Sequence, residues 1–296
     1  MLTQIPSTGL ACSILASLMF GLIPWYVQFL EPLNSSLLFW NRILFSAVTA
    51  FVAIVLLKQT EQLKQLLVTP KKLLWLTAGT VLVAMQWWLF LWAPVNDKTT
   101  DLSLGYFLLP LVLVLTGCIV YSEKLRPLQF VGAVLSAIGV GHELYQCGTL
   151  SWVVVAVAVG YPFYLLIRRK VQANSLSCFL FENILLLPFA LFSLLVDNSF
   201  HIILANNTNL FWLLPGLGIL TTAAMLLYVS ASKSIPVSLF GLMSYLEPAI
   251  LFMVAVFILR EPISQTQWVT YGFIWLATAI ICVDSIRLMI HRPVVA

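Results

Sequence analysis

The sequence contains few charged residues, and this scarcity excludes most soluble proteins. Only 9% of its 296 residues are Asp, Glu, Lys or Arg, whereas a soluble domain has about 25%. So few charged side chains cannot cover the surface of a soluble protein of this length. A soluble enzyme or binding module is therefore excluded. The sequence also has no basic arm that would indicate a nucleic-acid partner.

Residues that would form a cofactor or metal site are also missing. The five cysteines are scattered without a C-x-x-C pair, and the three histidines are far apart. Neither set has the spacing of a metal site or of a disulfide framework. There is no phosphate-binding loop of the type G-x-x-x-x-G-K-S/T, and no Ser–His arrangement. We expect no metal and no cofactor, and we do not expect an enzyme.

Hydrophobic residues make up 61% of the chain, and they fall into long runs. A membrane-spanning helix needs about 20 apolar residues. The runs predict an all-α polytopic membrane protein with ten transmembrane helices. The predicted spans are 8–30, 33–57, 73–93, 102–121, 128–146, 149–167, 176–196, 210–230, 237–258 and 267–286.

The basic residues between these spans predict the topology. Positively charged loops stay in the cytoplasm, so we compared the loops on the two sides of the predicted membrane. Lys98 and Arg260 are the only basic residues on one side, and Arg42 lies within a span. The other side carries Lys58, Lys64, Lys71, Lys72, Lys124, Arg126, Arg168, Arg169, Lys170, Lys233, Arg287 and Arg292. This asymmetry predicts that both chain ends are cytoplasmic.

An internal repeat divides the chain into two parts. Pro110 and Glu123 match Pro248 and Glu261 at an offset of 138 residues, and Pro24 matches Pro162 at the same offset. We therefore predict two five-helix repeats, residues 1–146 and 147–296, the second ending in a short cytoplasmic tail. Because five is odd, the second half enters the membrane inverted, as in many secondary transporters.

These landmarks, together with several short motifs, resemble a known family. The motifs are Phe20-Gly21 with Pro24, Phe39 with Arg42, Trp88-Leu89-Phe90 with Trp92, Ala93 and Asn96, Ser103-Leu104-Gly105-Tyr106-Phe107, Glu123, and Phe273-Ile274-Trp275 with Asp284. The whole chain is similar to the EamA-like drug/metabolite transporter superfamily, and within it to the RarD-type permeases. The resemblance implies a permease of the bacterial cytoplasmic (inner) membrane. Asn41 stands where such permeases would have His, and Glu247 where a less polar residue is expected.

Three ionisable residues fall within predicted spans, where an unpaired charge is costly. Arg42 is interpreted either as an anchor for a substrate carboxylate or as half of a structural ion pair. Glu182 aligns with Asn41 in the repeat, which suggests an Arg42–Glu182 pair or a proton-coupling role. Glu247 precedes Pro248, which interrupts helical hydrogen bonding. It is a second proton-coupling candidate and a substrate-binding candidate, or else a carboxyl group bonded to a neighbouring helix.

The remaining candidates are polar, aromatic or helix-breaking residues. Asn41, Trp88, Asn96, Tyr106 and Tyr245 join Arg42 and Glu247 as predicted substrate-binding residues, although aromatic residues in membrane helices often serve packing alone. The predicted gating or structural residues are Pro24, Pro110, Glu123, Pro162, Pro248 and Glu261.

Together these features predict a secondary transporter, an exporter of a small organic solute such as an amino acid, metabolite or drug. It would work by alternating access about a central cavity. Its partners would be the lipid bilayer, the solute and, if transport is coupled, protons; the oligomeric state stays open. The alternatives are a non-transporting accessory or receptor subunit, and a membrane enzyme acting on a lipid.

Overall fold

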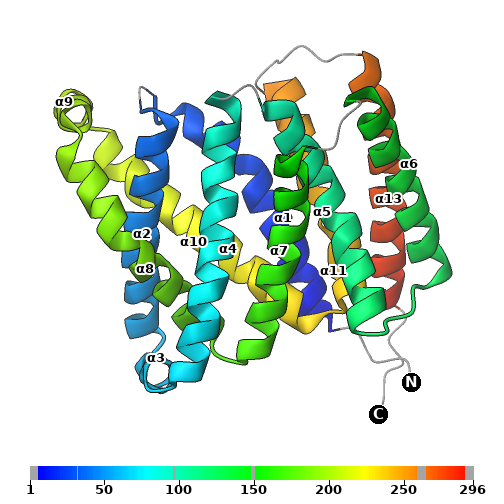
Figure 1. Ribbon diagram of the computed structural model, residues 1–296, viewed down its shortest axis with the longest axis horizontal. Coiled ribbons are helices and arrows are strands. Elements are labelled where there is room, and N and C mark those ends of the chain that lie inside the picture. Colours follow the sequence, from blue (N-terminus) through cyan, green and yellow to red (C-terminus); the bar gives the residue numbers. More distant parts are fainter. Residues whose placement is uncertain (1–5, 32, 96–97, 148–150, 259–264, 291–296) are drawn as a thin grey trace.

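The computed structural model describes residues 6–31, 33–95, 98–147, 151–258 and 265–290, and all regular structure in these ranges is helical. Figure 1 shows the helices side by side in one elongated bundle. Their bounds are α1 Ser7–Gln28, α2 Ser35–Leu56, α3 Thr60–Leu67, α4 Pro70–Val95, α5 Thr99–Val120, α6 Pro127–Cys147, α7 Trp152–Val171, α8 Ser175–Val196, α9 Asn198–Asn206, α10 Leu210–Ser234, α11 Val237–Met243, α12 Leu246–Met253, the π-helical η1 Val254–Ile258, and α13 Gln265–Ile290.

Six of the described helices are long and apolar enough to cross a membrane by themselves: α1, α2, α5, α7, α8 and α10. The pair α3 and α4, bent by 93°, can supply a seventh span. The large apolar side chains on the outside of the bundle include Ile119, Phe192 and Trp212, which are 76%, 70% and 83% exposed. Such an apolar exterior is suited to a bilayer. The chain is therefore a polytopic helical membrane protein.

Each of the ten predicted segments contains at least one helix, but three features differ from the prediction. Short helices α3 and α9 occupy stretches that were predicted as loops. The predicted ninth span, 237–258, is divided into α11, α12 and η1. The interruption at Ser244 and Tyr245 comes just before Pro248, which has no N–H to continue the helical pattern.

Local chemistry explains several helix starts. The Asn34 side chain accepts a hydrogen bond from the Leu37 amide at 2.8 Å, and the Asn174 side chain accepts two at 3.0 Å at the start of α8. These are N-caps, which satisfy amides that have no partner within the helix. Pro70 and Pro127 begin α4 and α6, where a missing N–H costs nothing.

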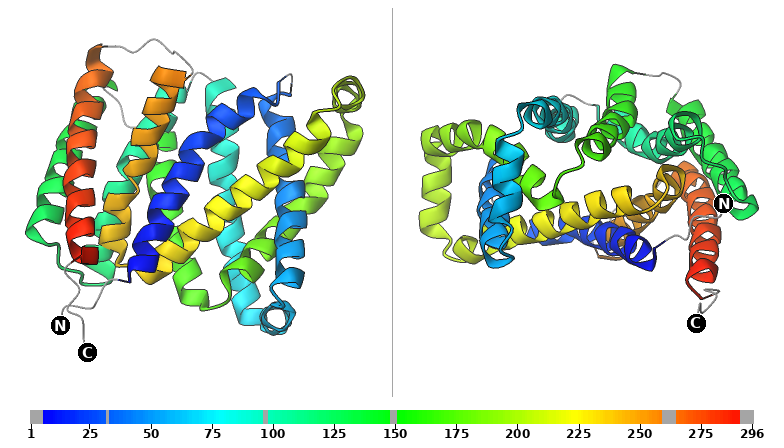
Figure 2. Two further views of the ribbon diagram at one scale, coloured as in Figure 1. Left: turned by 180° about the vertical axis from the view of Figure 1, so that it is seen from behind. Right: turned by 90° about the horizontal axis from the view of Figure 1, so that it is seen from below.

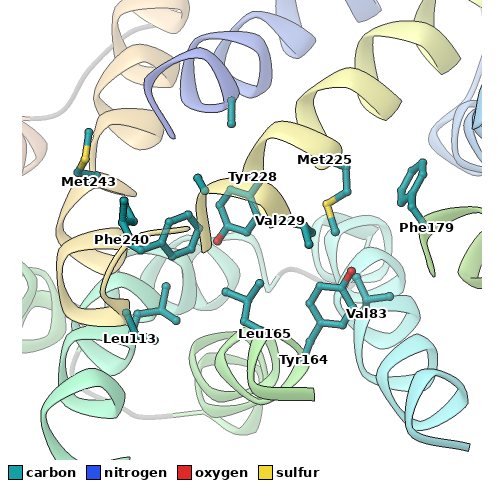
Figure 3. Close-up of a cluster of buried hydrophobic side chains, with 14 of the residues drawn as sticks. Val83, Leu113, Tyr164, Leu165, Phe179, Met225, Tyr228, Val229, Phe240 and Met243 are labelled. Carbon is teal, nitrogen blue, oxygen red and sulfur yellow. The ribbon is translucent and has the colours of Figure 1, made fainter. Parts of the chain in front are cut away.

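The helices pack in a recurring arrangement. Helix α1 lies along α10, and α7 lies along α4; α2 contacts α8, α5 contacts α11, and α6 contacts α13. The main core joins α1, α2, α4, α5, α7, α8, α10, α11 and α13. Figure 3 shows part of it, with side chains packed around Tyr164, Leu165 and Tyr228. The core therefore connects helices from both parts of the chain.

One end of the bundle collects the basic residues. Figures 1 and 2 show that α1 begins and α13 ends at this end, where α3 also lies. The helix ends there bear Lys58, Lys64, Lys71, Lys72, Lys124, Arg126, Arg168, Arg169, Lys170, Lys233 and Arg287. We call it the basic end. These are the residues that the charge asymmetry predicted to share one side of the membrane.

Candidate substrate cavity

A cavity of about 350 Å³ lies between α1, α2, α4, α5, α7, α10 and the α11–α12 segment. Its lining comes from the second half of α1 and the first halves of α2 and α5, so it sits away from the basic end. Most of its walls are apolar. The polar and aromatic lining residues are Phe20, Ser35, Phe39, Arg42, Trp87, Tyr106, Tyr161, Thr221, Tyr228, Ser244 and Glu247.

Arg42 supplies the positive charge of the cavity. Its guanidinium carbon lies 4.1 Å from the centre of the Trp87 ring, a stacking arrangement that favours a cation. The Trp87 indole N–H donates to the Tyr161 hydroxyl at 3.3 Å, which orients the ring. Arg42 Nε is buried without a hydrogen bond, and none of the ion pairs between described residues includes Arg42. The side chain is therefore held in place but can still bind an anion.

Glu247 supplies the negative charge, at the interruption between α11 and α12. Ser244 lies beside it on the cavity wall and donates its hydroxyl to the Phe240 carbonyl at 2.9 Å. Within the described residues, Glu247 has no ion-pair partner. Tyr228 closes this side of the cavity, with its ring edge-on to Phe20 at 5.8 Å and to Phe240 at 4.8 Å.

The cavity brings together three of the predicted substrate-binding residues, Arg42, Tyr106 and Glu247. Asn41 is buried behind the wall, where its amide donates to the Leu37 carbonyl at 2.9 Å. Tyr245 is fully buried and donates its hydroxyl to the Phe107 carbonyl at 3.1 Å.

Trp88 is 49% exposed and is absent from the cavity lining, which includes its neighbour Trp87. Successive helical residues point about 100° apart, and here Trp88 points away from the cavity that Trp87 lines. Asn96 lies outside the described residues.

The predicted Arg42–Glu182 pair is wrong. Glu182 instead forms a buried ion pair with Arg168, with 3.3 Å between Oε1 and Nη1, and both side chains are fully buried. The Tyr164 hydroxyl donates to the other carboxylate oxygen at 3.1 Å, and Arg168 Nη2 donates to the Ser175 carbonyl at 3.1 Å. Arg42 lies near the opposite end of its helix from the basic end, whereas Arg168 is at the basic end of α7.

The predicted gating or structural residues separate into two groups. Pro24, Pro110 and Pro248 line the cavity, whereas Pro162 lies on α7 towards the basic end, beside Leu165. Glu123 is not in the cavity. It accepts hydrogen bonds from the start of α11, at the Val237 amide (2.8 Å) and at the Ser238 amide (2.7 Å) and hydroxyl (2.6 Å). Glu261 lies outside the described residues.

Sequence reasoning missed Trp87, Tyr161 and Tyr228 at the cavity, and Tyr164 and Arg168 at the buried ion pair. Arg168 had been counted as a loop residue. One signal was available for it, because Tyr164 and Arg168 are four residues apart and so share a helix face. Tyr161 and Tyr228 gave no polar spacing that would distinguish them from aromatic residues used in packing.

Comparisons with known proteins identify the family. Residues 148–283 match the model of the EamA-like transporter family. The chain is 38% identical over 290 residues to the chloramphenicol-sensitive protein RarD of Pseudomonas aeruginosa, covering 97% of each chain. The chain belongs to the EamA-like transporter family, as a RarD-type permease. It is thus a multi-pass transporter of the bacterial inner membrane.

Other relatives agree with this assignment. Protein RarD of Escherichia coli K12 is 31% identical over 280 residues, covering 94% of this chain and 95% of its own length. An uncharacterized transporter of Vibrio cholerae is 31% identical, covering 94% of this chain and 93% of its own. One solved crystal structure superposes with a TM-score of 0.69 over 96% of this chain and 99% of its own, at 16% identity. That last likeness concerns the fold alone.

Proposed function

We propose that this EamA-like permease is a secondary transporter that exports a small organic solute, such as an amino acid, metabolite or drug. The observation that carries the proposal is a cavity within the bundle whose Arg42 forms no ion pair with any residue that the structure describes. A buried charge is costly unless a ligand or water compensates it. A non-transporting receptor or accessory subunit would have less use for such a cavity between the two parts of the chain.

Alternating access is proposed on the basis of an inverted repeat, with residues 1–146 and 147–296 as its halves. In the repeat, α1 matches α7 and α4 matches α10. A two-fold axis would therefore convert the packing of α1 against α10 into the packing of α7 against α4, and both contacts are present. The cavity walls support the same offset of 138 residues. Tyr106, Leu109 and Pro110 line the cavity, and so do Ser244, Glu247 and Pro248. In such folds the two halves rock about a central site.

Arg42 is the proposed anchor for a carboxylate or another anionic group of the solute. Its guanidinium can form two parallel hydrogen bonds with a carboxylate, while Trp87 holds it from the other face. Tyr106 and Glu247 would contact the rest of the solute. Asn41, Trp88, Asn96 and Tyr245 remain proposed contributors to the site. The contacts given above favour supporting roles for Asn41 and Tyr245.

Proton coupling, if present, has two candidates, Glu182 and Glu247. Glu247 faces the cavity, where an arriving solute can change its environment. Glu182 is bound by Arg168 and Tyr164, is fully buried, and is not among the residues that line the cavity. This contrast favours Glu247. For the orientation in the membrane, we propose that the basic end is cytoplasmic, following the positive-inside rule.

Solute counterflow in proteoliposomes that contain the purified chain tests the proposal. The panel would include labelled amino acids and small aromatic acids, with and without a pH gradient. We expect exchange in the parent, none in Arg42→Ala, and loss of the pH effect in Glu247→Gln but not in Glu182→Gln. Lys64→Gln is the matched control, because Lys64 lies on the exposed helix α3. Exchange in Arg42→Ala at the parental rate would remove Arg42 from the site. Absence of exchange across a broad panel would favour the accessory-subunit alternative.

A further inference from the structure

The connection between α10 and α11 lies at the basic end, and side chains from both parts of the chain hold it. On one side, Glu123 follows α5 and accepts the three hydrogen bonds from Val237 and Ser238 described above. Both amides belong to the first turn of α11, where backbone N–H groups have no partner within the helix. A carboxylate is stabilised at this position by the helix dipole as well as by the hydrogen bonds.

On the other side, Arg169 at the end of α7 holds the end of α10. Arg169 Nε donates to the Ser232 carbonyl at 2.6 Å, and Nη2 donates to the Ile235 carbonyl at 2.5 Å. The guanidinium also lies 5.2 Å from the centre of the Tyr121 ring, close in sequence to Glu123. A cation at a helix C-terminus has the same favourable relation to the dipole as a carboxylate at an N-terminus. We call Glu123 and Arg169 together the clamp.

Packing behind the clamp is tight. A void beside it, lined by Thr116, Leu165 and Phe240 among others, holds only about 10 Å³. A side chain on Gly117 would place its Cβ 2.5 Å from the Ser238 amide nitrogen and 2.6 Å from a Glu123 carboxylate oxygen. All seven residues of α11 are buried. The chain around the clamp is therefore closely packed, with a void too small for a solute.

Helix α11 connects the clamp with the cavity. Its first turn is bound by Glu123, and its last residue, Met243, is followed directly by Ser244 of the cavity wall. Tight contact along α5 continues at Gly241, where an added Cβ would lie 2.7 Å from the Pro110 carbonyl oxygen. Pro110 itself lines the cavity. A change in the cavity at Ser244 or Pro110 can thus be transmitted to the clamp through one short, fully packed helix.

We propose that Glu123 and Arg169 form the closed gate of the basic end, and that the solute passes only when both release the α10–α11 connection. They act as positioning residues and do not touch the solute. The inference rests on the alternating access proposed above. It goes further by assigning the gate to named hydrogen bonds and by assigning this structure to the state whose cavity is closed towards the basic end.

Cysteine accessibility tests the gate without requiring a known solute. In a background with the five native cysteines replaced, Thr116→Cys reports access from the basic end and Leu38→Cys reports access to the cavity. A membrane-impermeant maleimide is applied from each side of vesicles of known orientation. Glu123→Ala, Glu123→Gln and Arg169→Met are compared with Lys124→Gln, which removes an exposed neighbouring charge.

We expect labelling of Thr116→Cys from the basic end to rise about tenfold or more in Glu123→Ala and Arg169→Met, because losing bonds to a charged group shifts the population towards the open gate. Labelling of Leu38→Cys from the opposite side should fall in parallel. Glu123→Gln, which keeps an acceptor, should be intermediate, and Lys124→Gln should match the parent. Arg169→Lys should restore part of the closure. A general loosening of the fold would instead raise labelling at both positions.

Parental labelling in all the variants, with full labelling after denaturation, would overturn the gate. If Glu123→Ala fails to fold, Glu123→Gln and Arg169→Met carry the same comparison. Counterflow in the same vesicles separates the two proposals. Exchange with unchanged labelling overturns the gate and leaves transport standing. Shifted labelling without exchange across the panel supports the gate and counts against transport.

Discussion

The buried ion pair between Arg168 and Glu182 should be a major determinant of stability that cannot be dismantled one partner at a time. Both side chains have no exposed surface, and 3.3 Å separates Nη1 from Oε1. Besides this contact, Tyr164 donates a hydrogen bond to Glu182, and Arg168 donates one to the Ser175 carbonyl. Cys178 also interacts with Arg168, and Lys233 acts electrostatically on Glu182. Within the described residues, Arg168 Nε and Nη1 and Glu182 Oε1 have no hydrogen-bond partner. Each charge is therefore compensated mainly by the other.

The magnitude follows from what remains after one partner is removed. Glu182→Met leaves a buried guanidinium with one carbonyl acceptor, and Arg168→Met leaves a buried carboxylate with one hydroxyl donor. Each single change should lower the free energy of unfolding by about 3–5 kcal/mol. The double variant removes both charges and fills the space with apolar atoms. It should be much less destabilised than the sum of the single variants, with a coupling energy of about 2–3 kcal/mol.

The assay is reversible unfolding in mixed detergent micelles, followed by tryptophan fluorescence, for the parent, both single variants and the double variant. The control pair is Glu61 and Lys64, whose side chains are 71% and 70% exposed at an N–O distance of 2.8 Å. Breaking this pair should leave stability unchanged, because water replaces the lost partner. Additive effects of the Arg168 and Glu182 substitutions would refute the reasoning, since they would mean that the two charges are compensated independently.

Three further outcomes are expected. Trp87→Ala should raise the solute concentration that half-saturates counterflow by about two- to thirtyfold, which corresponds to the loss of a cation–π contact. Trp88→Ala, on the exposed face, should leave this concentration unchanged. Equal effects of the two substitutions would contradict the cavity assignment. Arg42→Lys should keep part of the exchange that Arg42→Ala loses, because the charge survives without the forked geometry; equal loss in both would show that the geometry is required. A reporter fused after Arg292 should read as cytoplasmic; an external reading would overturn the even number of spans.

The lengths of the apolar runs were sufficient for the class of fold, and they located a helix in each of the ten segments. They were not sufficient for helix ends and interruptions. Beside the interruption at Ser244 and Tyr245, Gly241 of α11 lies close to α5, and this contact joins segments that are far apart in the sequence. Pro248 signalled that the helix was perturbed, but a proline alone does not determine where a membrane helix breaks.

The candidate site was predictable where a residue was rare and costly. Arg42 and Glu247 were singled out because charges are seldom placed within spans, and both line the cavity. Pairing was a different matter. Glu182 was assigned to Arg42 by repeat alignment, although Arg168 was available at the other end of the bundle. Alignment of repeats identifies equivalent positions in the two halves. An ion pair instead requires that the two side chains lie at the same depth in the membrane. Because α2 and α8 run in opposite directions (Figure 1), aligned positions need not lie at the same depth.

The cavity also shows why a repeat of structure need not be a repeat of chemistry. Within the proposed two-fold arrangement, Pro110 and Pro248 occupy matching positions with the same residue, yet α5 continues through Pro110 whereas the matching segment is interrupted before Pro248. Glu247, in contrast, matches Leu109, and Tyr106 matches Ser244. The two halves can therefore share a backbone plan while the cavity keeps its carboxylate on one side. In the proposed alternating access, a solute bound by Arg42 would then meet the same polar side chains whether the cavity is open to one side of the membrane or to the other. The movement of the two halves would change which side is open, but not which residues bind the solute.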